Sequence, residues 1–398
     1  MPPPRSAASA LAANARRIAD VLRRTGPATR AEVALRTGLS RATVSAALNQ
    51  LLDSELAVEI GSGPGGPGGG RPPAVVRLGP RAGLAVGVDI GNRHLRVAVA
   101  DLGHEVLAVA NENHHAGRPA RVVLDRAAEM VTRELSGLGY GLAEVVGIGM
   151  GLPAPLGNRD IGRDAGGASV AASNLLPAWA GVSPGRELSE RLGCPVSVDN
   201  DANLGALAEF LWGAGRGTST IAYLKAATGI GGGLVINGEL FRGVTGTAGE
   251  IGHVTLDERG DVCRCGNRGC LELVAGGAAL VTAMRRTHHE VGTLGELIQL
   301  GIDGDPGCRR ILADAGSHIG VALGSLVNLV NPEAIVIGGE LGQADELLLD
   351  PMRRALRRAA IGPAVDAARV VPAQLGDRSE VLGAVAVVLR EHDQPTPC

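Results

Sequence analysis

The spacing of apolar residues changes near residue 84, and this change requires two kinds of folding unit in one chain. Before it, Leu11, Ile18 and Leu22 recur at helical spacing. After it, runs typical of strands alternate with helical segments. The expected strands cover 84–89, 94–100, 105–110 and 145–149, with a helix at about 119–136. The sequence therefore predicts a small helical head, residues 1–80, on an α/β body with mixed sheets.

Composition limits the core and the location. A chain of 398 residues suffices for two or three packed units. Aromatic residues make up only 2% of it, so Leu, Val, Ile and Ala must form the core. Lys225 is the only lysine among 38 basic residues, a bias typical of GC-rich coding. Because no run of about 18 apolar residues and no signal-peptide core are present, we expect a soluble cytoplasmic protein with no membrane partner.

The head has the spacing of a helix-turn-helix. Thr29 is placed to cap a short helix over residues 30–37, and a third helix follows. Ala34 is small where two helices would cross, and Gly38 permits a left-handed turn. Val44 is β-branched, as suits burial under the recognition helix. An ordinary helical hairpin has the same spacing, so the flanking segments must decide between the two.

A β-wing outline follows the helices. Residues 56–60 and 74–78 resemble paired strands, and Arg71 is the only charge in the glycine-rich segment between them. Such a tip is able to lay a guanidinium on the DNA backbone or in the minor groove. The same glycines also suit a plain linker. Residues 1–80 hold ten Arg against five Asp or Glu, a balance that favours nucleic-acid binding.

Small or hydrogen-bonding side chains lie on the expected outer face of the recognition helix, where they can approach base edges and phosphates. With Arg71, the residues that we expect to contact DNA are Ser40, Arg41, Thr43, Ser45 and Asn49. The head therefore predicts operator DNA as a partner. The alternative is a head that only mediates protein contacts, which predicts no salt-dependent binding to DNA.

A cysteine cluster indicates a metal site in the body. Three of the six cysteines, Cys263, Cys265 and Cys270, lie within eight positions. In a reducing compartment such a cluster indicates metal rather than disulfides. With His253 they supply one imidazole and three thiolates, a ligand set suited to tetrahedral zinc. Redox-active cysteines are the alternative. Since this set leaves no open ligand position, we expect the zinc to be structural.

Two glycine-rich turns adjoin expected strands. The first body strand ends in Asp89-Ile90-Gly91, and Thr228-Gly229-Ile230-Gly231-Gly232-Gly233 lies between two later strands. Such turns let backbone N–H groups approach an anion. Each turn alone is a weak signal, because the chain contains 60 glycines.

The order of these motifs resembles the ROK family, named for repressors, open reading frames and kinases. The succession is Asp89-x-Gly91, Gly151-Leu-Pro-Ala-Pro155, Asn200-Asp201-Ala202-Asn203, Thr228 to Gly233, Gly249-Glu250-Ile251-Gly252-His253, Cys263-x-Cys-Gly-x-x-Gly-Cys270-x-Glu272, and Asn331-Pro-Glu followed by Gly338-Gly339. The resemblance covers residues 84 to about 390, and the winged head matches the regulator branch.

This resemblance implies an actin-like, ribonuclease-H-like sugar-kinase fold, in which two α/β lobes hold a sugar between them behind an N-terminal winged helix. It also implies a homodimer or homotetramer. One lobe is expected to span 84–200 plus about 376–392, and the other 201–375 with the zinc loop.

The resemblance assigns sugar binding to five residues, all present here: Asn200, Asp201, Glu250, His253 and Glu272. A zinc-ordered loop would present two carboxylates and a ring nitrogen together, and carboxylates are good acceptors for sugar hydroxyls. A monosaccharide effector, a hexose or an amino sugar, is therefore expected. The alternative is that these polar residues cap helices, because Asn200 and Asp201 stand where a helix starts.

Kinases of the family use the residue corresponding to Asp201 as a catalytic base and hold ATP and magnesium at the two turns. The second turn is intact at Thr228, Gly229, Gly231 and Gly232. The first departs from the kinase pattern Asp-Ile-Gly-Gly-Thr-Lys, because this chain reads Asp89-Ile90-Gly91-Asn92-Arg93-His94. Ala154 also replaces a familiar glycine, and both changes crowd a site that needs close backbone approach.

The sequence therefore favours a sugar-responsive repressor without useful kinase activity over an ATP-dependent sugar kinase with a DNA-binding head. Sugar binding is expected to close the lobes and to change the separation of two recognition helices in a dimer. That separation must match half-sites about one helical turn apart. His114-His115 and His288-His289 have no obvious acidic or cysteine partner and are expected to be solvated.

Overall fold

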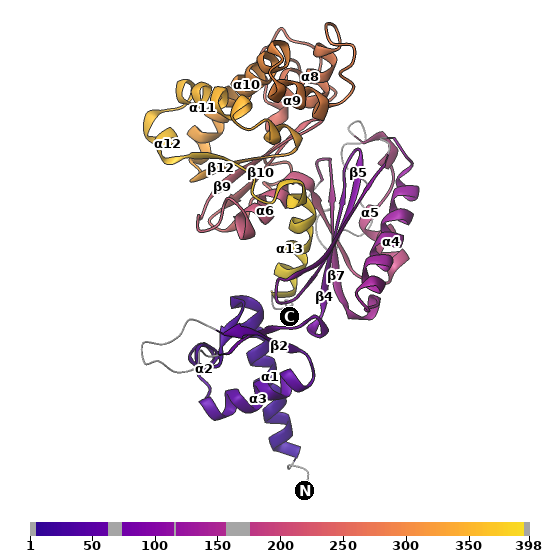
Figure 1. The fold of residues 1–398 in the computed structure, drawn as a ribbon, viewed down its shortest axis with the longest axis vertical. Helices are drawn as coiled ribbons and strands as arrows, with labels where there is room; N and C mark the ends of the chain where they lie inside the picture. The colour runs from indigo at the N-terminus through magenta and orange to yellow at the C-terminus, as the bar shows by residue number, and fades with distance from the viewer. Residues whose placement is uncertain (1–4, 63–73, 115–116, 157–175, 394–398) are drawn as a thin grey trace.

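The computed structural model describes residues 5–62, 74–114, 117–156 and 176–393, and their strands form three sheets (Figure 1). The expected wing tip with Arg71 lies outside the described residues, as does His115. Among the described helices, none combines the length and the apolar character needed to span a bilayer.

The head contains three helices and a small sheet. Its elements are α1 (Arg5–Thr25), α2 (Arg30–Thr37) and α3 (Arg41–Asp53), and, in sheet order, β1 (Ala28–Thr29), β3 (Ala74–Leu78) and β2 (Ala57–Ser62). Thr29 caps α2 as predicted, because its side chain accepts from the N–H of Glu32 and the Glu32 carboxylate accepts from the N–H of Thr29. Gly38 turns the chain with a φ of 67°, and Ser40 caps α3. Val44 is fully buried, as the helix-turn-helix spacing predicts.

The first sheet of the body has the order β6-β5-β4-β7-β8, in which β4 runs parallel to β7 and β7 parallel to β8. Its strands are β4 (Leu84–Ile90), β5 (His94–Asp101), β6 (Val106–Asn113), β7 (Val145–Leu152) and β8 (Val196–Asn200). Alternate side chains of β4 pack against α4 (Ala120–Gly137) and α5 (Pro184–Leu192) on one face. The other face carries α13 (Ser379–Asp393).

Two glycines let α13 approach the first sheet closely. A Cβ at Gly87 would lie 2.3 Å from the carbonyl oxygen of Val381, and one at Gly149 would lie 2.0 Å from that of Ala384. A larger residue at either position would push the helix away from the strands. Helix α13 therefore packs closely on a sheet whose strands lie between residues 84 and 200.

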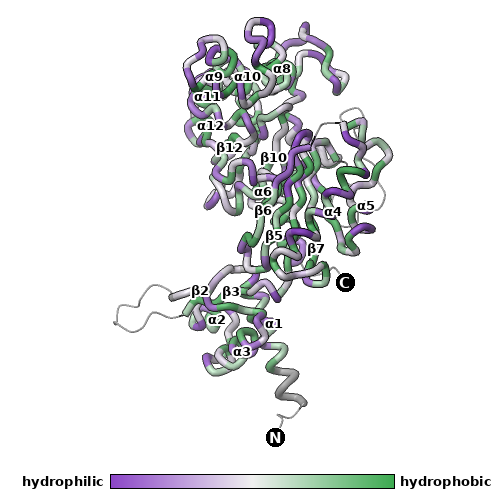
Figure 2. Tube along the Cα trace, turned by 45° about the vertical axis from the view of Figure 1, so that its right-hand side comes forward, coloured by the Kyte–Doolittle hydropathy of each residue, from purple (hydrophilic) through white to green (hydrophobic). Residues whose placement is uncertain are grey.

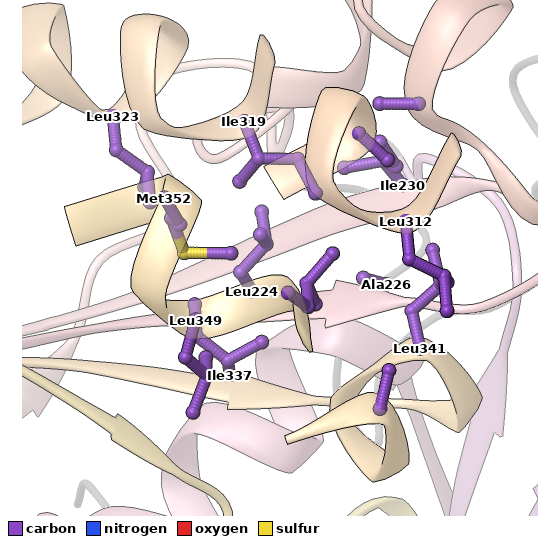
Figure 3. Packing of buried hydrophobic residues seen from close by; sticks show 14 of the residues in the cluster. Leu224, Ala226, Ile230, Leu312, Ile319, Leu323, Ile337, Leu341, Leu349 and Met352 are labelled. Atoms are coloured by element: carbon purple, nitrogen blue, oxygen red, sulfur yellow. The ribbon is translucent and has the colours of Figure 1, made fainter. Parts of the chain in front are cut away.

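The second sheet has the order β11-β10-β9-β12-β13. Its strands are β9 (Ile221–Ala226), β10 (Ile230–Ile236), β11 (Glu239–Leu240), β12 (Ala334–Gly338) and β13 (Arg369–Pro372). The surrounding helices are α7 (Glu272–Ala275), α8 (Gly277–Met284), α9 (Leu294–Asp303), α10 (Pro306–Val330), α11 (Glu346–Ala359) and α12 (Gly362–Ala367). Figure 3 shows Leu224 and Ile337 of the sheet packed with Leu323 of α10 and with Leu349 and Met352 of α11. This core is aliphatic, as the composition predicts.

Two helices, α6 (Asp201–Trp212) and α13, lie between the two larger sheets (Figure 1). Helix α6 starts directly after β8, packs on β9 and β10, and contacts α13 through Leu204 and Leu207. Hydrophobic residues run along these strands and helices, while polar residues gather in the outer turns (Figure 2). The N-termini of α6 and α13 meet near the end of β9, where Lys225 pairs with Asp201 and with Glu380.

A buried ion pair and apolar packing join the head to the body. Arg77 of β3 pairs with Asp101 at the end of β5, and the Asp101 carboxylate is fully buried. The other oxygen of Asp101 accepts from the N–H groups of Gly103 and Glu105. Leu389 near the end of α13 belongs to the apolar cluster that contains the head's core. The head is thus fixed to the ends of β5 and α13.

Candidate functional site

The four predicted zinc ligands converge on one point. The Cys263 sulfur lies 3.6 Å from His253 Nδ1, and the Cys265 sulfur lies 3.7 Å from the Cys270 sulfur. All four ligand atoms lie within 4.8 Å of one another. Cys263 and Cys270 are buried, whereas Cys265 is exposed. The fold therefore gathers one imidazole and three thiols at a candidate metal centre.

The spacing of these atoms fits zinc. With Zn–S bonds of about 2.3 Å and Zn–N bonds of about 2.0 Å, tetrahedral geometry places neighbouring ligand atoms roughly 3.5–3.8 Å apart. The two measured separations, 3.6 Å and 3.7 Å, agree with that range. Thiolate and imidazole ligands suit zinc and do not suit magnesium or calcium. The residues present therefore fit a closed, structural zinc site.

The segment 253–272, here called the cysteine loop, folds back on itself to bring these ligands together. Thr255 and Cys270 form a short antiparallel bridge. Gly269 has a φ of 59°, and a Cβ at this position would lie 1.7 Å from the carbonyl oxygen of Asp257. Because only glycine tolerates both the left-handed backbone and this contact, the local sequence dictates the turn.

Three acidic residues, Asp201, Glu250 and Glu272, form what we call the carboxylate cluster beside the cysteine loop. Burial, together with the charges of Asp201 and Glu272, raises the pKa of Glu250 to about 7, although Arg264 opposes the shift. His253 Nε2 lies 3.9 Å from a Glu250 oxygen, so the ring that turns Nδ1 to the cysteines turns Nε2 to this cluster. A ligand rich in hydroxyl groups would satisfy such acceptors.

Glu272 connects the cysteine loop to the second glycine-rich turn. Its Oε2 accepts from the N–H of Ile230 at 3.0 Å, and its Oε1 pairs with Arg264 at 2.9 Å. A Cβ at Gly229 would lie 2.3 Å from Glu272 Oε2, so a larger residue there would have to displace this carboxylate. Arg264 was not among the site residues predicted from the sequence. Its position between Cys263 and Cys265 was the signal that could have identified it.

Asn200 caps a helix, as the alternative interpretation states. Its Oδ1 accepts from the N–H groups of Ala202 at 2.9 Å and Asn203 at 3.3 Å. Its Nδ2 donates to the carbonyl oxygen of Ala154 at 3.0 Å. The cap places Asp201 in the first turn of α6. Sugar binding by Asn200 therefore stays a prediction. The observed contacts of Asn200 position Asp201.

Lys225 lies at the centre of a second group of charges, here called the lysine cluster, with Asp89, Asp201 and Glu380. Its ammonium lies 2.8 Å from Asp201 Oδ2 and 3.4 Å from Glu380 Oε1. Burial opposes a charge on Lys225, but the surrounding carboxylates outweigh it and raise the pKa of the ammonium group. Tyr223 donates to the same Glu380 oxygen at 3.0 Å. The single lysine of the chain is thus a buried ion-pair partner, which composition alone did not reveal.

The first glycine-rich turn faces protein groups. Asp89 is fully buried, and its Oδ2 lies 2.7 Å from His94 Nε2 and 3.4 Å from Arg96. Burial raises the pKa of Asp89, but the hydrogen bond with His94 and the charges of Lys225 and Arg96 outweigh it and lower the pKa to about 2. A Cβ at Gly91 would lie 2.2 Å from the His94 ring, and the Gly91 N–H donates to the His94 carbonyl oxygen at 2.9 Å.

The second glycine-rich turn is more open at its tip. Thr228 is exposed and Gly229 half-buried. Farther along β10, a Cβ at Gly231 would lie 3.2 Å from Ala202 of α6, and one at Gly232 would lie 2.6 Å from the carbonyl oxygen of Gly249. These glycines serve close packing inside the protein. A phosphate-binding role for this turn stays a prediction.

In the head, α3 carries the predicted DNA contacts toward solvent. Ser40, Arg41 and Asn49 are exposed, and Thr43 and Ser45 are half-buried. Arg30 of α2 donates to the Asn49 side-chain oxygen at 3.0 Å. The Ser40 and Thr43 hydroxyl oxygens lie 2.8 Å apart and share a hydrogen bond. The helix therefore presents an exposed guanidinium in its first turn and an exposed amide two turns later, with hydroxyl groups between them.

Two histidines that were expected to be solvated have protein partners, so that prediction was wrong. His288 Nε2 lies 3.1 Å from an oxygen of Asp305, and both lie close to the thiol of Cys308. His114 Nε2 lies 2.9 Å from the carbonyl oxygen of Gly91. Asp305 and Cys308 belong to the start of α10, and the tertiary fold brings them to His288.

Comparisons with protein families cover both parts of the chain. The model of the ROK family matches residues 85–391, and a model of a winged helix-turn-helix DNA-binding domain matches residues 11–57. The xylose repressor of Bacillus spizizenii is 30% identical over 368 residues, which are 92% of each chain. The glucokinase of Halalkalibacterium halodurans is 31% identical over 75% of this chain and 92% of its own.

Solved structures of ROK family proteins also match the chain. A ROK family transcriptional regulator, a homolog of the E. coli MLC protein, matches with a TM-score of 0.72 at 24% identity over 96% of both chains. A ROK glucokinase from Streptomyces griseus, in complex with glucose and AMPPNP, matches with a TM-score of 0.66 at 28% identity over 77% of this chain and 99% of its own.

The regulator covers the head and the body, whereas the kinase covers about as much of the chain as the body alone. The two-lobed sugar-kinase-like architecture predicted from the motifs is therefore confirmed, together with the winged head. This chain belongs to the ROK family, and it carries a winged helix-turn-helix DNA-binding domain in front of the family's α/β body.

Proposed function

We propose that this protein is a sugar-responsive, DNA-binding transcriptional repressor that works in the cytoplasm as a homodimer or homotetramer. One observation carries the proposal: a single chain holds a recognition helix with an exposed outer face and a carboxylate cluster braced by the cysteine loop. Relatives named xylose repressor, matched along 92% of each chain, support it. We divide the chain into a head (1–80), a first lobe (84–200 with 376–392) and a second lobe (201–375).

The effector is a neutral monosaccharide. Asp201, Glu250 and Glu272 accept hydrogen bonds from its hydroxyl groups, and His253 Nε2 adds a further polar contact. Lys225 pairs with Asp201 and Arg264 with Glu272, but the three carboxylates outnumber these two cations, which argues against sugar acids and sugar phosphates. Asn200 contributes by capping α6 and thereby fixing Asp201. Xylose is the first candidate, because the repressor relatives are named for it, and glucose, named in the kinase relative, is the second.

Zinc has a structural role in this proposal. His253, Cys263, Cys265 and Cys270 would hold the ion, which when bound supplies a four-way crosslink and no catalytic position. The crosslink fixes both ends of the loop that carries Arg264 and leads into Glu272. It also fixes His253 in the orientation that turns Nε2 toward Glu250. Without the ion, two members of the carboxylate cluster lose their support.

Operator DNA is bound by the head. The contacts come from Ser40, Arg41, Thr43, Ser45 and Asn49 of the recognition helix and its cap, with Arg71 of the wing. Arg30 holds the Asn49 amide in place through its oxygen, which leaves the amide nitrogen as the donor for a base or a phosphate. The exposed Arg41 supplies the charge in the first turn of α3, where a phosphate also benefits from the helix dipole.

Two elements connect the sugar site to the head. Strand β5 begins at His94, beside Asp89, and ends at Asp101, which pairs with Arg77 of the wing strand. Helix α13 begins next to Glu380 of the lysine cluster and ends in the apolar cluster of the head. A sugar-driven shift of the lobes therefore moves the whole head as one rigid unit. The sugar shifts this equilibrium only by its different affinity for the two arrangements.

An ATP-dependent sugar kinase is the second candidate function. Asp201 and the open tip of the second turn favour it, and ATP and magnesium would be its cofactors. The pairing of Asp89 with His94 and Arg96 argues against it, because a kinase needs that end of the site for phosphate and metal. The regulator is the better-supported function.

The test uses the purified full chain and DNA from its own promoter region. We expect salt-dependent binding by fluorescence anisotropy, and release of the DNA on addition of one neutral sugar from a panel. Arg41→Ala should weaken DNA binding without changing sugar affinity. Arg310→Ala, which removes the same charge from an exposed ion pair on α10, serves as the control. Sugar phosphorylation with ATP and magnesium at roughly 1 per second or faster, or no salt-dependent binding to DNA, would contradict the proposal.

A further inference from the structure

Lys225 occupies an unusual position for the only lysine of the chain. It lies near the end of β9, with its side chain 13% exposed, where the N-termini of α6 and α13 meet. Asp201 comes from α6 and Glu380 from the first turn of α13, and both pair with the ammonium group. One side chain thus ties the second sheet to the two helices that separate the sheets.

Magnesium, which kinases of the family need, does not fit among these residues. The ion takes near-ideal octahedral oxygen coordination at about 2.0–2.1 Å. Asp89 Oδ2 is already bound by His94 and Arg96, and Asp201 Oδ2 by Lys225. Asp89 Oδ1 is buried without a hydrogen-bond partner among the described residues. The positive charge of Lys225 acts on Asp89 as well, which compensates this oxygen without a metal.

The nucleotide phosphates do not fit either. At the first turn, the Gly91 N–H donates to the His94 carbonyl oxygen, and the His94 ring fills the space in front of Gly91. At the second turn, the Ile230 N–H donates to the Glu272 carboxylate. A backbone N–H that already has an acceptor cannot also bind a phosphate oxygen at full strength. One N–H group of each turn is therefore already occupied by a group of the protein itself.

We infer that Lys225 is a built-in cation that takes the place of the divalent metal, and that Lys225 with Asp201 forms one wall of the sugar site. Lys225 keeps Asp201 ionised and oriented as an acceptor for a sugar hydroxyl, and it excludes magnesium and nucleotide from the lysine cluster. The inference rests on the proposed function for its sugar, but its claim about metal and nucleotide stands by itself.

Because Lys225 is the only lysine, its side chain can be observed by itself in an NMR spectrum. Protein grown with lysine labelled at the ε-carbon with carbon-13 gives one lysine side-chain resonance, because the chain has one lysine. We expect this resonance to shift saturably with the same neutral sugar that releases promoter DNA, and with the same affinity. We expect ATP with magnesium to leave it in place. A shift with ATP and magnesium, or no shift with a sugar that releases DNA, would overturn the inference.

A variant pair tests the exclusion of metal, with Mn²⁺ as a paramagnetic stand-in for magnesium. Lys225→Met keeps the length of the side chain and removes its charge, so we expect saturable Mn²⁺ binding that the wild type lacks. Arg390→Met is the control, because it removes a positive charge from α13 outside the lysine cluster, where Arg390 pairs with Glu239 of β11. It should bind no more Mn²⁺ than the wild type.

The outcomes separate the inference from the proposed function. Saturable Mn²⁺ binding by the wild type at the lysine cluster, or equal Mn²⁺ binding by Lys225→Met and Arg390→Met, would overturn the role of Lys225. If Lys225→Met fails to fold, the labelled wild type still decides, since it needs no substitution. If no sugar releases DNA, the proposed function fails, and the response of the labelled lysine to ATP and magnesium still tests the inference.

Discussion

Glu250 is a half-buried and Asp89 a fully buried carboxyl group of the body, and their surroundings shift their pKa values in opposite directions. At Glu250, burial and the neighbouring acids Asp201 and Glu272 raise the pKa to about 7. At Asp89, burial is outweighed by His94, Lys225 and Arg96, and the pKa falls to about 2. Glu250, which is crowded by other acids, gains from a ligand's hydroxyl groups, whereas the charge of Asp89 is already balanced by basic side chains.

This difference teaches how a kinase-like fold can serve as a sensor. The end of the site near the cysteine loop keeps acceptors that a sugar can satisfy. The end near the first glycine-rich turn is neutralised by the protein's own cations, which leaves no role for a metal or a nucleotide. The two ends should therefore respond to substitution differently, and four predictions follow this contrast from the largest expected effect on sugar affinity to the smallest.

Cys265→Ser should have the largest effect. Loss of one of four ligands removes part of the roughly 10–16 kcal/mol of apparent zinc-binding free energy, so the zinc content should fall and the sugar response should fall with it. DNA binding by the head should persist without sugar. Zinc content measured by elemental analysis, with calorimetric sugar binding, checks this.

Cys308→Ser is the matched control for the cysteine loop. Cys308 also lies near a histidine and an acid, His288 and Asp305, but these two bind each other and Asp305 caps α10. This variant should keep its full zinc content. Full zinc in Cys265→Ser, or loss of zinc in Cys308→Ser, would show that the wrong cluster has been assigned.

Glu272→Ala should come next, because it removes an acceptor from the carboxylate cluster and leaves Arg264 without its partner. Each charge-assisted hydrogen bond is worth about 1.5–3 kcal/mol, so sugar affinity should fall roughly 10- to 100-fold. DNA binding in the absence of sugar should not change. Glu346→Ala, which breaks an exposed pair with Arg353, should leave both properties at wild-type values. Unchanged sugar affinity in Glu272→Ala would remove this residue from the site.

Asp89→Asn should barely change sugar affinity, since Asp89 belongs to the closed end, but it should change stability. A carboxyl group whose folded pKa is about 2 instead of 3.8 contributes stability that is complete above pH about 4 and is lost as the pH falls toward 2. This contribution amounts to about 2 kcal/mol. Urea unfolding at several pH values should show a weaker acid dependence in the variant. An identical acid dependence in both proteins would contradict the assignment.

Arg77→Ala should have the smallest effect on sugar affinity and should act instead on the transmission to DNA. The Arg77–Asp101 pair joins the wing strand to the far end of β5. Coupling free energies of this kind are typically 1–3 kcal/mol, so the sugar-induced loss of DNA affinity should shrink about 5-fold or more. Arg81→Ala, which breaks an exposed pair with Glu55, is the control. A full sugar response in Arg77→Ala would place the transmission route elsewhere.

The sequence by itself determined the features whose partners are close in the chain. Thr29 and Ser40 cap the helices that they precede, and Gly38 makes the turn between them. The four candidate metal ligands lie within one short loop, so their spacing already predicted that they converge. The α/β body and the two glycine-rich turns, one intact and one altered, could also be predicted from the sequence, because strands, helices and tight turns follow from local patterns.

Only the tertiary structure decided which distant charges meet. Lys225 pairs with Asp201 and with Glu380, which stand 24 and 155 positions away in the chain, and His288 meets the start of α10. No local pattern records these pairings, because they depend on how α6 and α13 lie between the two sheets. The free energy of a buried charge depends on the charges around it. The role of Lys225 as an ion-pair partner could therefore be recognised only in the folded protein.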